Sequence, residues 1–167
     1  MCNQTRDPSF TIRSATSKDT ALILKFIREL ADYEKLLHEV VADEATLKES
    51  LFGATPHAKV IIGEYQGVAV SFALYFHNFS TFLGRPGIYL EDLYVQPTMR
   101  GKGLGTILLG YLASVAIELK CGRLEWWVLD WNKPAIEFYE SLGAKPMDEW
   151  TVNRVTGDAL NKLAEKL

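Results

Sequence analysis

The chain has 167 residues, of which 48% are hydrophobic and 23% charged, and its formal net charge is -3. These values are typical of one soluble globular domain with a sizeable core, and the acidic balance argues against nucleic acid as a partner. No apolar run is long enough to span a membrane, and the first residues lack the apolar stretch of a secretory signal. We therefore expect residues 1–167 to form a single cytoplasmic domain.

The few potential metal ligands and disulfide-forming residues are scattered along the chain. The cysteines and histidines are Cys2, Cys121, His38, His57 and His77. Their spacing matches neither a disulfide framework nor a metal site. We expect no metal cofactor, and we expect Cys2 to lie in a frayed N-terminal tail.

Hydrophobic periodicity predicts the elements of the N-terminal half. The pattern predicts a strand at 10–13, an amphipathic helix from Leu22 to Leu37, a helix at 43–52 and a hairpin of strands 59–65 and 68–76. Asp43 is a suitable N-cap for the second helix. Residues 78–87, with their glycine, proline and serine, are predicted to form a loop.

The C-terminal half alternates strands and helices. The pattern predicts strands at 88–95, 124–129 and 150–155, helices at 106–119 and 132–142, and one or two helical turns at 158–167. The order β-α-α-β-β-β-α-β-α-β indicates an α/β fold with one mixed central sheet flanked by helices.

A glycine-rich segment, Gln96 to Thr106, lies between a predicted strand and a predicted helix. Its glycines allow a ligand to approach the backbone closely, and the first N–H groups of the helix have no partners within the helix. Arg100 and Lys102 add positive charge to that of the helix dipole. The segment therefore predicts a site for phosphate or pyrophosphate.

The spacing of the glycines in this segment distinguishes between the possible phosphate-containing ligands. It lacks the four intervening residues of a P-loop and the third-glycine position of a dinucleotide fingerprint. It fits Arg-x-x-Gly-x-Gly, with Arg100, Gly103 and Gly105. A tight turn without any ligand remains the structural alternative.

This spacing resembles the acetyl-CoA pyrophosphate loop of the GNAT N-acetyltransferases, and the predicted order of elements is also that of the GNAT fold, whose sheet is mixed and mostly antiparallel. The runs Tyr89 to Val95, Arg100 to Gly105 and Trp131 to Tyr139 come in the same order as in the diamine (spermidine/spermine) and thialysine acetyltransferases. Leu30 to Leu36 is similar to that branch too. The resemblance implies direct acetyl transfer from acetyl-CoA to a primary amine of a small molecule, through a tetrahedral intermediate.

The reaction needs a base for the protonated amine, donors for the oxyanion and an acid for the leaving thiolate. The resemblance places Glu91 at the amine as the base and Tyr139 at the sulfur of CoA as the acid. Glu91 and Asp92 are neighbours, which face opposite ways in a regular strand. The structural alternatives are a solvated strand carboxylate for Glu91 and a packed aromatic for Tyr139.

The resemblance also implies a set of cofactor-binding residues. Backbone groups of Leu93, Tyr94 and Val95 would pair with the pantetheine amides as an added strand. The set continues with Arg100, Gly101, Lys102, Gly103, Leu104, Gly105, Thr106, Asn132, Pro134 and Tyr139. Asn132 is also a suitable helix N-cap.

Carboxylates and aromatic rings suit a pocket for an ammonium group. We assign Tyr33, Glu34, Glu91, Trp126 and Glu149 to it. Polyamine enzymes carry an acidic residue with Pro and Trp before the Glu-Asp strand. This chain has Ser80-Thr81-Phe82 there, which looks more like the thialysine-type members. That departure puts long polyamines in doubt as substrates.

Other functions remain open at this stage. They are a CoA-binding module without catalysis, an acetyltransferase acting on a protein amine, and a nucleotide-dependent oxidoreductase. The resemblance further implies a homodimer, with the apolar segment around Trp150, Thr151 and Val152 as the edge that meets the partner.

Overall fold

The computed structural model describes residues 2–167, with side chains described from Thr5 onward. The chain divides into two compact units, the first ending at Trp131 and the second running from Asn132 to Leu167.

The first unit is built on a sheet that has six strands over the described residues, each strand lying beside the next one along the chain. The strands are β1 (Cys2–Gln4), β2 (Phe10–Ser14), β3 (Lys59–Tyr65), β4 (Val68–Ser80), β5 (Arg85–Val95) and β6 (Leu124–Trp126). Neighbours are antiparallel except β5 and β6, which are parallel. The predicted mixed, mostly antiparallel sheet is confirmed.

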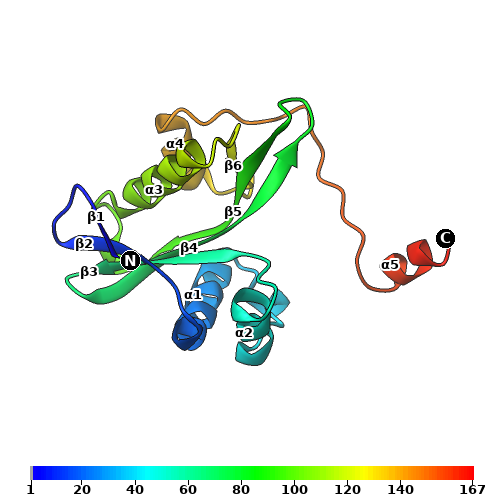
Figure 1. Ribbon diagram of the computed structural model, residues 1–167, viewed down its shortest axis with the longest axis horizontal. Coiled ribbons are helices and arrows are strands. Elements are labelled where there is room, and N and C mark those ends of the chain that lie inside the picture. Colours follow the sequence, from blue (N-terminus) through cyan, green and yellow to red (C-terminus); the bar gives the residue numbers. More distant parts are fainter. Residues whose placement is uncertain (1) are drawn as a thin grey trace. The chain divides into compact units, whose positions relative to one another are not determined.

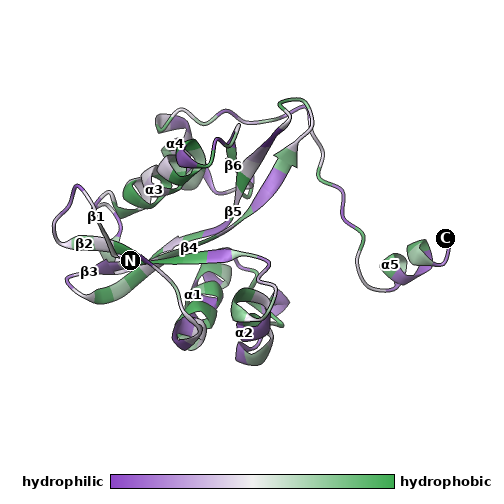
Figure 2. Ribbon diagram, viewed as in Figure 1, coloured by the Kyte–Doolittle hydropathy of each residue, from purple (hydrophilic) through white to green (hydrophobic). Residues whose placement is uncertain are grey.

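Helices cover both faces of this sheet (Figure 1). They are α1 (Thr20–Tyr33) and α2 (Glu44–Phe52) on one face and α3 (Leu104–Glu118) on the other, with short 3-10 helices at η1 (Ser17–Asp19), η2 (Leu37–Glu39) and η3 (Pro97–Met99). Phe26 of α1 packs against the rings of Phe72 and Tyr94, each with its centroid 5.7 Å away. Figure 2 shows that α3 carries hardly any hydrophilic residues, as expected of a helix packed on a sheet.

Local signals explain where several elements begin. The Asp43 carboxylate accepts a hydrogen bond from the Thr46 N–H at 2.7 Å, so the predicted N-cap of α2 is confirmed. The turn between β3 and β4 places Gln66 and Gly67 at φ 51° and 79°. Two successive positive φ values are typical of the tight turns that join antiparallel strands.

The second unit contains α4 (Lys133–Ser141) and α5 (Gly157–Ala164). The Asn132 side chain accepts a hydrogen bond from the Ala135 N–H at 3.4 Å, so its predicted capping role is confirmed. After α4, Gly143 adopts φ 91°, and the Ala144 N–H donates to the Tyr139 carbonyl at 3.2 Å. These contacts satisfy carbonyl groups that the helix end leaves unpaired.

Five local predictions are wrong. The helix predicted to reach Leu37 ends at Tyr33, because Lys35 adopts φ 64° and stops the helix. Residues 150–155 form no strand among the described residues, because a strand needs a paired neighbour for its backbone groups and this segment has none there. The strand predicted at 124–129 ends at Trp126, where its pairing with β5 ends. Most of the predicted loop 78–87 belongs to β4 and β5, which pair as far as Ser80 and Arg85. Cys2 lies in β1, paired with Arg13 of β2, and its side chain is outside the described part.

Candidate functional site

A β-bulge lies in the middle of β5. Along the ladder with β4, Asp92 pairs with Leu74 and Leu90 pairs with Tyr75, so Glu91 is the extra residue between them. A bulge redirects the side chains around it and is common beside functional sites. The two neighbouring carboxylates, Glu91 and Asp92, therefore do not follow the simple alternation of a regular strand.

The register shows which face Asp92 occupies. Its partner Leu74 belongs to the buried cluster that also holds Phe26 of α1, and directly paired residues share a face of the sheet. Asp92 therefore points toward the α1 face and is half-buried, whereas Glu91 is exposed. Two residues further on, Tyr94 lies in the same cluster.

Burial beneath α1 has a large effect on the acidity of Asp92. Burial, reinforced by the negative charges of Glu91 and Glu34, raises the pKa of Asp92 to about 7. Burial also raises the pKa of Glu34, the residue that follows α1. The predicted pocket residues Glu34 and Glu91 therefore lie close enough to Asp92 to interact with it. A carboxyl group with a pKa near neutrality is suited to binding or deprotonating an ammonium group.

Among the strands that the structure describes, only β4 pairs with the part of β5 beyond the bulge. β6 pairs with β5 from Ile88 to Leu90 and ends there. The predicted pantetheine-binding residues Leu93, Tyr94 and Val95 all lie beyond that point. Burial and the neighbouring Glu29 raise the pKa of Tyr94 to about 12. The Tyr94 side chain is thus part of the core, which leaves its backbone as the part that a ligand could bind.

The glycine-rich segment leads from η3 into α3. Gly101 and Gly103 both have φ 76°, and Gly103 is the N-cap of α3. A Cβ atom added at Gly101 would meet no atom within 4 Å, and one at Gly103 would meet only an Arg6 nitrogen at 3.9 Å. The backbone here therefore borders open space, as a ligand-binding loop requires.

The start of α3 presents backbone donors to that space. Among the described residues, the N–H groups of Leu104, Gly105 and Thr106 have no hydrogen-bond acceptor, and the first bond of the helix is donated by Ile107 to the Gly103 carbonyl at 3.1 Å. Unpaired donors at a helix N-terminus bind phosphate groups well. The predicted phosphate site thus has both the open backbone and the donors that it needs.

The two cations of this segment contact aromatic rings of other elements. The Arg100 guanidinium lies 4.7 Å from the centroid of the Tyr33 ring, and its Nε donates to the Val95 carbonyl at 3.1 Å. The Lys102 Nζ lies 5.7 Å from the centroid of the Tyr65 ring. Arg100 thus joins the predicted cofactor segment to the end of α1, where the predicted pocket residues Tyr33 and Glu34 lie.

A row of aromatic and cationic groups continues from Tyr33. The Trp131 ring lies 6.3 Å from the Tyr33 ring, and the Lys35 Nζ lies 5.0 Å from the Trp131 centroid. Asp92, Lys35 and Trp131 were not among the residues assigned to the site from sequence. The signal for Asp92 was a second carboxylate within an apolar strand, and Trp131 was already part of the motif that begins the run to Tyr139.

The other predicted residues are distributed over both units. Trp126 is half-buried on β6 and pairs with Leu90, one residue before the bulge. The remaining ones, Asn132, Pro134, Tyr139 and Glu149, belong to the second unit. There Pro134 lies in the first turn of α4, and the Tyr139 ring contacts that of Phe138 with centroids 5.2 Å apart.

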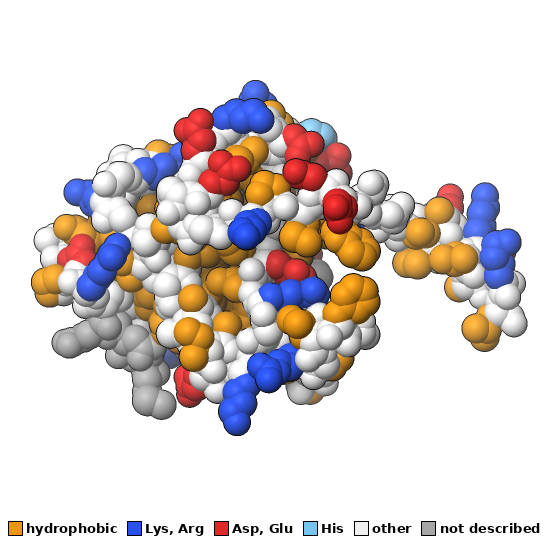
Figure 3. Space-filling view, turned by 90° about the horizontal axis from the view of Figure 1, so that it is seen from above, with side chains coloured by type: hydrophobic (Ala, Val, Ile, Leu, Met, Phe, Trp, Pro, Cys, Tyr) orange, Lys and Arg blue, Asp and Glu red, His pale blue; other side chains and the backbone are white. Residues whose placement is uncertain are grey.

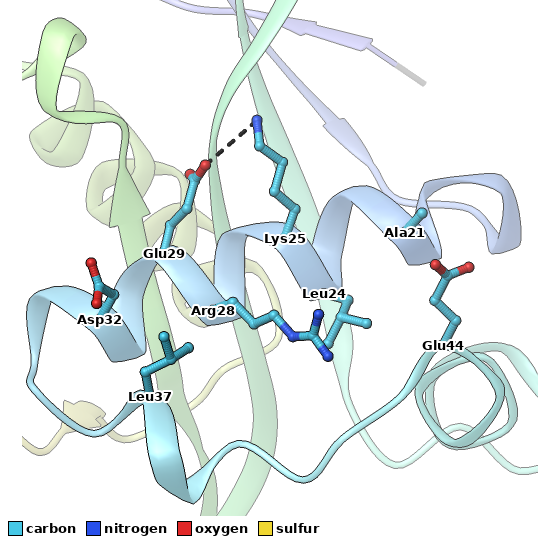
Figure 4. Close-up of a pocket in the computed structure, with 8 residues that line it drawn as sticks. All are labelled: Ala21, Leu24, Lys25, Arg28, Glu29, Asp32, Leu37 and Glu44. Atoms are coloured by element: carbon cyan, nitrogen blue, oxygen red, sulfur yellow. Dashed lines mark ion pairs between the residues drawn. The ribbon is translucent and has the colours of Figure 1, made fainter.

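A separate hollow lies on the outer side of α1 (Figure 4). It is lined by Ala21, Leu24, Lys25, Arg28, Glu29, Asp32, Leu37 and Glu44, with an ion pair of 3.5 Å between Lys25 and Glu29. None of the residues predicted for the site lines it. This hollow is therefore not the candidate site.

The described residues provide neither a membrane span nor a cluster of metal ligands. No helix among them is long and apolar enough to cross a membrane. They also contain no group of three or more histidine, cysteine, aspartate or glutamate side chains placed to hold a metal ion.

Comparison with known proteins adds independent findings. The model of the acetyltransferase (GNAT) family matches residues 25–144. Thialysine N-epsilon-acetyltransferase of Bos taurus is 42% identical over 93% of this chain and 97% of its own length. L-ornithine N5-acetyltransferase of Arabidopsis thaliana is 32% identical over 91% of this chain and 86% of its own length.

A solved structure agrees with these relatives. An integron cassette protein from the mobile metagenome of V. cholerae superposes with a TM-score of 0.79 at 30% identity, covering 94% of this chain and 98% of its own. The family match extends across most of the chain, including the bulged strand, the glycine-rich segment and α4. The chain belongs to the GNAT family of acetyltransferases.

Proposed function

We propose that this protein transfers the acetyl group of acetyl-CoA to a primary amine of a small molecule, such as a diamine, a polyamine or a thialysine-like amino acid. The observation that carries the proposal is the arrangement around β5. This strand carries carboxylates at its bulge and leads, through η3, to an open backbone loop and unpaired donors at the start of α3. The relatives named for acetylating thialysine and L-ornithine support an amino acid as the acceptor.

The proposed cofactor site follows from that arrangement. The N–H groups of Leu104, Gly105 and Thr106 would bind the pyrophosphate, with charge from Arg100 and Lys102. The pantetheine amides would pair with backbone groups of β5 beyond Leu90, where β6 has ended. In the second unit, Asn132, Pro134 and Tyr139 would complete the site for the arm and its sulfur.

The proposed acceptor site provides negative charge and aromatic faces. Glu34, Asp92 and Glu91 attract an ammonium group, and Tyr33, Trp126 and Glu149 complete the pocket. The resemblance assigns the role of base to Glu91, acting directly or through water, and its exposure at the bulge leaves it accessible to an acceptor. Tyr139 acts as the acid, since a phenol is protonated at neutral pH and can donate to a thiolate.

Assembly and location belong to the same proposal. The family match crosses the boundary at Asn132, which supports a single acetyltransferase domain over residues 1–167. Trp150, Val152 and Val155 expose much of their side chains, and apolar side chains also gather on α5 (Figure 3). Exposed apolar segments mark interaction surfaces, which supports a homodimer. We expect the protein to act in the cytoplasm without a metal or nucleic acid.

An amine panel tests the function directly. Release of CoA from acetyl-CoA should be measured with diamines, polyamines, diamino acids and a lysine-containing peptide, alongside calorimetry of acetyl-CoA and NAD. We expect acetyl-CoA to bind and at least one small amine to be acetylated. Binding without transfer would indicate a CoA-binding module, transfer only to the peptide would indicate a protein substrate, and binding of NAD alone would indicate an oxidoreductase.

A further inference from the structure

Lys35 places a positive charge on the row of aromatic rings that begins at Tyr33. It follows Glu34 directly, and consecutive Cα atoms are about 3.8 Å apart. Its Nζ lies 5.0 Å from the centroid of the Trp131 ring, and that ring lies 6.3 Å from the Tyr33 ring. The residue that follows Glu34 therefore holds a cation against an exposed aromatic surface.

Lys35 forms no ion pair with any carboxylate that the structure describes. The ion pairs found among the described residues do not include Lys35. The negative charge of its neighbour Glu34 helps to raise the pKa of Asp92. The charge of Lys35 is thus available to a ligand, and it can form a charge-assisted hydrogen bond with an anionic group.

The positive charge of Lys35 and the negative charges of the carboxylates together discriminate between diamines and diamino acids. A diamine carries ammonium groups at both ends, and one of them would be repelled by Lys35. A diamino acid carries a carboxylate as well, which Lys35 would attract while Glu34, Asp92 and Glu91 attract its ammonium groups. Its methylene chain would lie along the rings of Tyr33 and Trp131.

We propose that Lys35 is a specificity-determining residue that binds the α-carboxylate of a diamino acid acceptor and disfavours the corresponding diamine. This inference rests on the proposed function, because it assigns the acceptor class of the same site. It concerns selection and not chemistry, so Lys35 takes no part in proton transfer.

A second lysine provides a matched control. Lys35 has φ 64°, and its N–H donates to the Asp32 carbonyl at 3.0 Å while Leu36 donates to Ala31 at 2.8 Å. Lys120 has φ 55° after α3, and it donates to Ile117 at 3.0 Å while Cys121 donates to Ala116 at 2.8 Å. Both lysines therefore follow a helix in the same backbone motif. The backbone conformation alone does not distinguish Lys35; its neighbours do.

The experiment compares matched acceptors that differ only in the carboxylate. Ornithine is paired with 1,4-diaminobutane and lysine with 1,5-diaminopentane, and kcat/KM is measured for the wild type and for Lys35→Met, Lys35→Arg and Lys120→Met. Calorimetric binding of each acceptor to the protein with bound CoA gives a readout independent of turnover.

We expect Lys35→Met to lower kcat/KM and affinity for the diamino acids by about tenfold, the loss of one charge-assisted hydrogen bond. For the diamines kcat/KM should rise about two- to threefold, because a repulsive charge has been removed. Lys35→Arg should retain the preference for diamino acids, and Lys120→Met should behave as the wild type.

Equal losses for both members of a pair would overturn the role of Lys35, as would a preference that Lys35→Met leaves intact. In either case the acetylation of amines by the wild type would still stand. A wild type that neither binds nor acetylates any of these acceptors would instead overturn both the amine acetyltransferase proposal and the role of Lys35.

Discussion

The guanidinium of Arg100 lies over the ring of Tyr33, 4.7 Å from its centroid. Tyr33 is the last residue of α1, and Arg100 follows η3 on the way to α3. The contact joins the segment proposed to bind the pyrophosphate with the helix end proposed to bind the amine.

Loss of the Tyr33 ring should therefore weaken binding of acetyl-CoA. A cation–π contact at an exposed position contributes about 0.5–1 kcal/mol, so Tyr33→Leu should lower acetyl-CoA affinity about two- to fivefold. Tyr33→Phe keeps the ring face and should retain the affinity. Calorimetry measures both, and equal affinities for the Leu and Phe variants would show that the ring does not position Arg100.

Gly103→Asp should greatly reduce acetyl-CoA affinity, because it places a side chain and a negative charge in the open space before α3. The positive φ makes any such substitution cost about 1–2 kcal/mol of stability. Gly67→Asp controls for this, since Gly67 has φ 79° and equally open surroundings in the β3–β4 turn. Calorimetry should show lost binding for Gly103→Asp alone; if both variants bind normally, the loop is not the phosphate site.

The pKa of Asp92 predicts how stability depends on pH. In the folded protein this pKa is about 7, against 3.8 for a free side chain. Ionisation is therefore harder in the folded state, and the contribution of Asp92 to the free energy of unfolding falls as pH rises from about 4 to about 7. Asp92→Asn removes that loss.

We thus expect Asp92→Asn to be more stable relative to the wild type at pH 8 than at pH 4, in urea unfolding at both pH values. Ionised Asp92 also attracts the ammonium group, so kcat/KM of the wild type should rise through pH 7 and the variant should lose this rise. The same stability difference at both pH values would contradict the assigned pKa.

Tyr139→Phe should lower kcat by about a hundredfold to ten-thousandfold, the usual contribution of general acid catalysis. The ring and its contact with Phe138 are retained, so acetyl-CoA should still bind. Tyr111→Phe removes one hydroxyl from α3 and serves as the control. Steady-state kinetics with the best amine measures kcat for the wild type and both variants. A near-wild-type kcat for Tyr139→Phe would show that Tyr139 is a packing residue and not the acid.

The homodimer predicts a mass of twice the chain mass of 18.8 kDa at micromolar concentration. Trp150→Glu should shift the mass toward the monomer, because it adds charge to the exposed apolar segment. Val41→Glu adds the same charge at another exposed apolar position and should leave the dimer intact. Light scattering measures all three, and a monomeric wild type would refute the dimer.

Elements that rest on local signals could be predicted from the sequence. The hairpin follows from its apolar strands and the turn at Gln66-Gly67, and α2 follows from its cap at Asp43. The glycine-rich segment was found because its spacing is a backbone requirement that does not depend on distant partners.

Features that depend on distant partners could not be predicted. The bulge at Glu91 exists only in the register of β5 against β4, so the sequence of β5 alone could not reveal it. The contacts of Lys35 with Trp131 and of Arg100 with Tyr33 join residues far apart in the chain. Residues 150–155 have strand-like composition, but composition does not supply a partner strand.

Substitution and deletion of Glu91 would have different structural effects, because Glu91 forms the bulge. Because Glu91 is the extra residue, replacing its side chain leaves the spacing between Leu90 and Asp92 intact, and Glu91→Gln changes the chemistry alone. Deleting Glu91 would instead restore a continuous ladder between β4 and β5. The shortened protein would gain regular pairing and lose the local twist that a bulge introduces. The deletion would thus make the sheet more regular but displace the acceptor site. At this position the proposed function requires one residue more than a regular sheet does.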